Sequence, residues 1–123
     1  MIKLKLTVSD LNLLLDYFSM VKKAIQTAIK TRKRFTPEHF LHLTELFELQ
    51  VMTTKFQIKR INMLGNSPSK KLTMCLTPTQ GYVFMKYNTV FEQTKSSTAL
   101  TTNSTAIILN YSGFIHNHFI NLK

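Results

Sequence analysis

Residues 72–80 read LTMCLTPTQ, and residues 2–10 read IKLKLTVSD. In each stretch an apolar residue alternates three times with a polar or small one, which is the pattern of a β-strand with one buried face. Thr77 then suits the N-cap of a helix, Pro78 its first position, and Gln80 completes a Thr-x-x-Gln capping box. The two stretches align at a shift of 70 residues, with Asp10 in the place of Gln80. The sequence therefore predicts a strand-helix-helix unit that occurs twice.

Two long amphipathic helices are expected after the first strand, over residues 9–33 and 37–64, because apolar residues recur there at spacings of three and four. Each helix carries a second apolar stripe beside the first, and for the helix over residues 9–33 this predicts more than one packing neighbour. In the second helix one stripe contains Phe40, Leu43, Phe47, Val51, Ile58 and Ile61, and its neighbour contains Leu46, Leu49 and Phe56. The short link around Thr36 and Pro37 predicts an antiparallel hairpin.

The second half is expected to repeat this order after the breaker sequence GNSPS at residues 65–69. We predict a strand over 71–76, a helix over 78–95, a polar loop and a final segment over 105–122. Helical spacing favours a helix for that segment, whereas its β-branched residues leave a strand open. The predicted fold is α+β and mostly helical, a single domain over residues 1–123 with repeat halves of about 1–64 and 70–123. Four helices would cover one face of a two-stranded antiparallel ribbon.

Charge favours an anionic partner. The chain has 16 Lys and Arg against six Asp and Glu, a net charge of +10, and such a field attracts nucleic acid, anionic lipid or acidic protein. Compositional bias of an AT-rich genome towards lysine is the alternative explanation.

The outer face of the predicted ribbon is the first candidate site. Alternation would place Lys3, Lys5, Lys71, Thr73 and Cys75 on it. A two-stranded ribbon fits the DNA major groove, and helix N-termini beside it can hold phosphates. The order of elements resembles that of the ribbon-helix-helix family of DNA-binding proteins, with this chain similar to both halves of such a dimer joined together. That resemblance implies DNA binding through the ribbon.

A second basic cluster ends the first helix. It comprises Lys22, Lys23, Lys30, Arg32, Lys33 and Arg34, with Lys55, Lys59 and Arg60 at the other end of the hairpin. Clusters of this kind bind phosphates without regard to sequence, although charges that merely solvate a helix face give the same pattern.

Catalytic and metal-binding signatures are weak in this sequence. His39, His42 and Glu45 are spaced at i, i+3 and i+6, which has already drifted around a helix and matches no strong metal motif. Cys75 is the single cysteine, the carboxylates are scattered, and three glycines supply no phosphate-binding loop. We therefore expect no metal, no cofactor and no enzymatic activity.

The predicted function is that of a small basic binding protein whose favoured ligand is nucleic acid, held mainly through phosphates. The alternative is a protein-interaction or assembly module that binds a partner or itself through strand edges and the surplus apolar stripes. Without a long apolar run we expect no membrane span, and the lone cysteine suits the cytoplasm.

Overall fold

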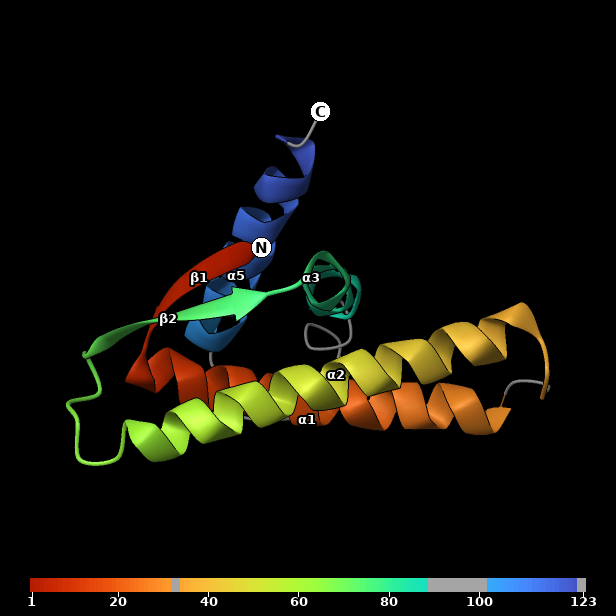
Figure 1. Ribbon diagram of the computed structural model, residues 1–123, viewed down its shortest axis with the longest axis horizontal. Coiled ribbons are helices and arrows are strands. Elements are labelled where there is room, and N and C mark those ends of the chain that lie inside the picture. The colour runs from red at the N-terminus through yellow and green to blue at the C-terminus, as the bar shows by residue number, and fades with distance from the viewer. Residues whose placement is uncertain (32–33, 89–101, 122–123) are drawn as a thin grey trace.

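The computed structural model describes residues 1–31, 34–88 and 102–121 (Figure 1). In chain order the described elements are β1 (Ile2–Thr7), α1 (Val8–Thr31), α2 (Pro37–Asn62), β2 (Lys71–Leu76), α3 (Pro78–Lys86) and α5 (Thr102–Ile120). These residues form an α+β fold that is mostly helical, with four helices packed on a two-stranded antiparallel sheet. The predicted fold class is confirmed. Within the described residues, no helix is both long and apolar enough to cross a bilayer.

The two strands pair along their whole length, with Ile2 opposite Leu76 and Thr7 opposite Lys71. Successive side chains of a strand point to opposite faces. The apolar side chains of both strands therefore point to the same face, towards the helices. All of them are buried: Ile2, Leu4, Leu6, Leu72, Met74 and Leu76. This is the inward face that the alternation predicts.

Helices α1 and α2 form the expected antiparallel hairpin (Figure 1). Before α2, Phe35 has a φ of 65°, in the left-handed region that few residues other than glycine adopt. The Thr36 side chain then accepts a hydrogen bond from the backbone N–H of His39 at 3.3 Å, and Pro37 occupies the first turn. The chain thus reverses in a few residues, as the Thr-Pro signal indicates.

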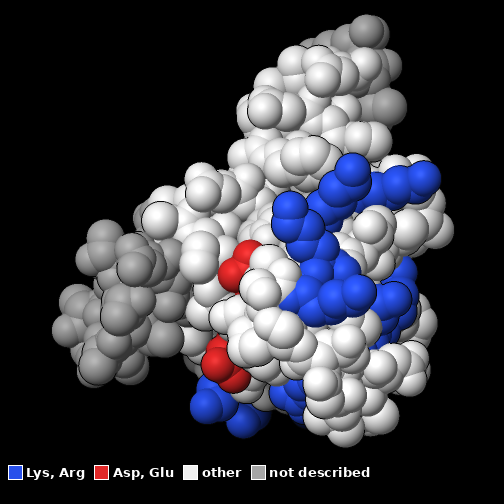
Figure 2. Space-filling model, turned by 90° about the vertical axis from the view of Figure 1, so that its left-hand side faces the viewer, with Lys and Arg blue, Asp and Glu red and all other residues white. Residues whose placement is uncertain are grey.

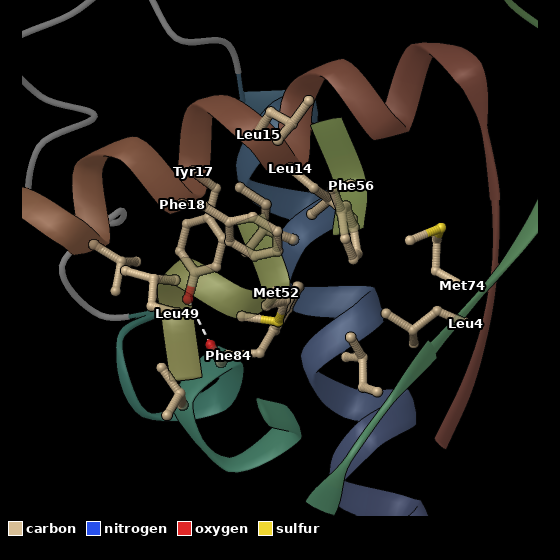
Figure 3. Packing of buried hydrophobic residues seen from close by; sticks show 14 of the residues in the cluster. Leu4, Leu14, Leu15, Tyr17, Phe18, Leu49, Met52, Phe56, Met74 and Phe84 are labelled. Atoms are coloured by element: carbon tan, nitrogen blue, oxygen red, sulfur yellow. Dashed lines mark hydrogen bonds between the residues drawn. The ribbon is translucent and has the colours of Figure 1, made fainter. Parts of the chain in front are cut away.

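Aromatic rings from three helices meet in the core (Figure 3). Phe18 of α1 lies edge-on to Phe56 of α2, with ring centroids 4.9 Å apart. Tyr17 lies 5.2 Å from Phe84 of α3 and donates a hydrogen bond of 2.5 Å to the Phe84 carbonyl. Helix α1 therefore packs on both α2 and α3, which confirms that α1 has more than one packing neighbour.

The helix that follows the strand is shorter in the second half of the chain than in the first. Helix α3 has 9 residues where α1 has 24, and the rest of the predicted helix 78–95 lies largely outside the described residues, as does most of the predicted polar loop. Helix α5 shows that the final segment is helical and that its helix begins at Thr102. Among the described elements the order strand-helix-helix recurs, and its origin in a duplication stays a prediction.

Candidate nucleic-acid interface

The outer face of the sheet carries lysines from both strands. Lys5 lies opposite Thr73, and Lys71 is one diagonal step away, opposite Thr7. Lys3, Lys5, Lys71 and Thr73 are all exposed, whereas Cys75, opposite Lys3, is half-buried. Cross-strand and diagonal neighbours lie within about 8 Å. The pairing thus brings three ammonium groups and a hydroxyl from distant parts of the sequence onto one small surface.

The loop before β2 is fixed to the start of α1. Backbone N–H groups at a helix start have no partner within the helix, and here Val8 N–H donates to the Lys70 carbonyl at 3.1 Å and Ser9 N–H to the Pro68 carbonyl at 3.0 Å. Asp10 N–H donates to the Thr7 hydroxyl at 3.2 Å. Figure 2 views the molecule from the side of this loop and shows Lys and Arg side chains gathered there, with few acidic ones among them.

A groove of about 620 Å³ runs between β1 and α5. On the strand side it is lined by Lys3, Leu4 and Lys5, and at one end by Asp10. On the helix side it is lined by Ile107, Asn110, Tyr111 and Phe114. The Phe114 side chain is 51% exposed although it is large and apolar. Aromatic rings and lysines that are about 110 residues apart in the sequence therefore share one hollow, which no local sequence signal reveals.

A hydrogen bond of Tyr111 fixes α5 beside this groove. Its hydroxyl donates to Asp10 Oδ2 at 2.7 Å, which links α5 to the first turn of α1. Burial raises the pKa of Tyr111, and the hydrogen bond to Asp10 and the negative charge of that carboxylate raise it further. The hydroxyl consequently remains a neutral donor at physiological pH.

The hairpin-turn part of the second predicted cluster lies far from the sheet. Lys30 and Arg34 are exposed at the turn of the hairpin, whereas Arg32 and Lys33 lie outside the described residues. Helix α1 has 24 residues, so at a rise of about 1.5 Å per residue it separates the turn from the sheet by roughly 36 Å. The sheet lysines and the basic residues at the hairpin turn therefore form two sites, not one.

Lys55, which the sequence groups with the basic cluster, has a structural role. Its ammonium group donates to the Cys75 carbonyl at 2.7 Å and to Gln80 Oε1 at 3.3 Å. The same Gln80 oxygen accepts from Thr77 N–H, while Gln80 N–H donates to the Thr77 hydroxyl, which is the predicted capping box. Lys55 thereby ties α2 to the junction of β2 and α3.

Among the described residues, Glu45 is the buried charged side chain. It is 2% exposed, and its carboxylate lies 2.6 Å from Lys86 Nζ, accepts from the Tyr87 hydroxyl at 2.7 Å and contacts His42 Nδ1 at 3.1 Å. These partners offset the cost of burying the charge. Across the described ranges, no group of three or more His, Cys, Asp or Glu side chains could hold a metal ion. The available sequence signal for this cluster was an acid one turn before the buried apolar positions Leu49, Met52 and Phe56.

Helix α2 leaves its larger apolar stripe uncovered. The face towards α1 and α3 buries Glu45, Leu49, Met52 and Phe56. The opposite face exposes Phe40, Leu43, Phe47, Val51, Ile58 and Ile61, by between 38% and 64%. Two apolar faces on one helix require two neighbours, and the described residues cover one of these faces.

Comparison with models of protein families, with curated proteins and with solved structures gives no match.

Proposed function

We propose that this protein is a small, non-enzymatic nucleic-acid-binding protein. Lysines of the outer sheet face hold phosphates, and the groove between β1 and α5 receives an unpaired base. The observation that carries the proposal is the shared groove of Lys3, Lys5 and the exposed ring of Phe114.

The charge distribution supports the phosphate contacts. Within the described residues, the ion pairs of lysine and histidine involve Glu45 and leave Lys3, Lys5 and Lys71 available. Ammonium groups bind phosphate oxygens as point charges and need no fixed geometry. The outer face offers no Arg, Asn or Gln for bidentate contacts to base edges, so binding dominated by the backbone fits these residues best.

The groove supports a preference for single strands. Single-strand binding combines a positive groove with aromatic rings on which bases stack. A volume of about 620 Å³ falls within the range of small-molecule pockets and suits a nucleobase that is free of its partner strand. Tyr111 and Asn110 line the same groove and offer polar atoms to the base edge.

Fluorescence anisotropy with matched single-stranded and duplex oligonucleotides tests the proposal. We expect tighter binding of the single strand, with log K falling with log salt at a slope of about −2 if three lysines contact phosphates. Phe114→Ala should weaken single-strand binding by about 5- to 150-fold, the range that corresponds to losing one base–aromatic stack. Duplex binding should change far less.

Charge reversal locates the phosphate contacts. The triple variant Lys3→Glu, Lys5→Glu, Lys71→Glu removes the sheet patch and should abolish binding at physiological salt.

The matched control reverses three lysines of α1, Lys22→Glu, Lys23→Glu and Lys30→Glu, and lowers the net charge equally. It should retain most of the affinity. If the control loses binding and the sheet variant keeps it, the site lies on the hairpin and the proposal is wrong; no binding by the wild type at low salt would also reject it.

The second candidate is a protein-interaction module, which the uncovered apolar face of α2 favours. Binding through that face should respond little to salt, whereas phosphate binding should weaken steeply.

A further inference from the structure

The exposed face of α2 has the spacing of a coiled-coil seam. Its central positions are 40, 44, 47, 51, 54, 58 and 61, which alternate steps of four and three residues. The side chains are Phe40, Thr44, Phe47, Val51, Thr54, Ile58 and Ile61. This repeat is the one by which two helices pack with knobs into holes. We infer that two copies of this chain pair through the α2 seam in antiparallel orientation. The inference goes beyond nucleic-acid binding. It rests on the second candidate function and specifies that the protein partner is a second copy of this chain.

The two threonines of the seam can be buried without leaving a hydroxyl group unpaired. The Thr44 hydroxyl donates to the Phe40 carbonyl at 3.0 Å, and the Thr54 hydroxyl donates to the Gln50 carbonyl at 2.9 Å. Burying a hydroxyl is costly when it has no partner, and both of these hydroxyls have one in their own helix. The seam therefore offers a continuous dry surface over 22 residues, or about 33 Å of helix.

Charge along α2 selects the orientation of the partner. All three acids of α2, Glu38, Glu45 and Glu48, precede residue 50, whereas its three basic residues, Lys55, Lys59 and Arg60, follow it. Of these charges, Glu48 and Lys55 flank the seam at equivalent positions, whereas Glu45 is buried on the opposite face of α2. An antiparallel second copy brings Glu48 of one helix beside Lys55 of the other and also opposes the helix dipoles.

Some of these charges already have partners inside the chain. Glu45 binds Lys86, and Lys55 binds the Cys75 carbonyl. Exposed ion pairs add little affinity and chiefly set specificity and orientation. Lys55 keeps its charge and a third N–H donor beyond its contacts with the Cys75 carbonyl and Gln80. The apolar seam accordingly supplies the affinity, and Glu48 with Lys55 supplies the direction.

The central register of the seam pairs it with itself over most of its length. When Val51 lies opposite Thr54 of the second copy, Phe47 falls opposite Ile58 of that copy. A hollow of about 350 Å³ lies on the seam and is lined by Phe47, Val51, Ile58 and their neighbours. It is placed to receive the opposing side chain as a knob. Glu48 then lies beside Lys55 of the second copy, on the same flank of the seam.

Sedimentation at high salt and without nucleic acid tests the pairing, so that its outcome does not depend on nucleic-acid binding. We expect a reversible dimer at micromolar concentrations. Phe47→Glu should weaken the dimer at least about 100-fold, because each of the two copies then places a glutamate within the apolar interface. Phe47 is 63% exposed, so this variant should keep the circular-dichroism spectrum of the wild type.

The matched control is Leu109→Glu, which places the same charge on an exposed leucine of α5. The control should dimerise as the wild type does. Equal weakening by Phe47→Glu and Leu109→Glu, or none by either, would overturn the assignment to the α2 seam.

Disulfide cross-linking reads the orientation. In a Cys75→Ser background, equal amounts of Phe47→Cys and Ile58→Cys chains should form the mixed cross-link between positions 47 and 58. Cross-links of 47 to 47 and of 58 to 58 would instead show a parallel pair and reject the antiparallel arrangement. A wild type that stays monomeric at millimolar concentration would reject the pairing itself, and if such a monomer binds lipid vesicles, the seam contacts a membrane surface.

Discussion

Gly81 in α3 and Gly113 in α5 provide a matched test of how the two halves of the chain pack. Both glycines lie within helices, where alanine is favoured over glycine by about 1 kcal/mol. Local sequence alone therefore predicts that either glycine-to-alanine substitution stabilises the protein. A Cβ at Gly113 would meet nothing within 4 Å, whereas a Cβ at Gly81 would lie 2.6 Å from Ile2 Cδ1 and 3.1 Å from Ile115 Cγ2.

The magnitude follows from two opposing terms. Overpacking a core costs about 1–3 kcal/mol, and Ile2 is fully buried between the sheet and the helices. Gly81→Ala should therefore destabilise the protein by up to about 2 kcal/mol after the helix-propensity gain of about 1 kcal/mol. Gly113→Ala should stabilise it by up to about 1 kcal/mol. The free energies of unfolding of the two variants should differ by about 1–3 kcal/mol.

Urea unfolding followed by circular dichroism measures these differences, and a double-mutant cycle identifies their cause. Ile2→Val removes the Cδ1 atom that meets the new Cβ and should by itself cost about 0.5–1.5 kcal/mol. In the Gly81→Ala background it should cost about 1 kcal/mol less, since it relieves the contact. If Gly81→Ala stabilises as much as Gly113→Ala and no coupling to Ile2 is found, α3 does not pack on β1 and α5 in this way.

Two further outcomes depend on buried polar groups. Glu45→Gln keeps the shape of the side chain but removes its charge, and it should destabilise the protein by about 2 kcal/mol; adding Lys86→Met should recover part of this loss in urea unfolding. An unchanged unfolding midpoint for Glu45→Gln would contradict the described ion pair. Burial raises the pKa values of Tyr17, Tyr87 and Tyr111 above the ordinary value of 10.0. Unfolding exposes phenols that ionise near pH 10, so stability should be fully present below that pH and fall above it. Tyrosinate absorbance of the folded protein checks the cause, because ionisation of all the tyrosines near pH 10 would refute it.

Local patterns determined most of the elements. Alternation over residues 2–6 and 72–76 fixed which strand residues face inward, because a side-chain period of two leaves no other arrangement with a buried face. Thr36 and Thr77, each followed by proline, marked the helix starts, since capping depends on residues close in sequence. For residues 105–122 the spacing favoured a helix, and β-branching did not override it.

The candidate site was only partly accessible to such reasoning. Lys3, Lys5, Lys71 and Thr73 were found from alternation together with the expected antiparallel pairing. Phe114 and Tyr111 were not expected to lie beside these lysines, because no local pattern specifies where the last helix packs. Lys55 was grouped with the basic cluster of the hairpin, although its ammonium group is used within the fold.

By itself the sequence determined the order of strands and helices, the inward face of the sheet, the basic outer face and the presence of two apolar stripes on α2. Each of these depends on residues within a few positions of one another, where backbone geometry and side-chain period decide. Only the tertiary structure decided which stripe of α2 is covered, that Glu45 is buried against α3, and that α5 forms a groove with β1. These outcomes depend on contacts between residues 40 to 110 positions apart, and the packing of whole elements, rather than any local preference, selects them.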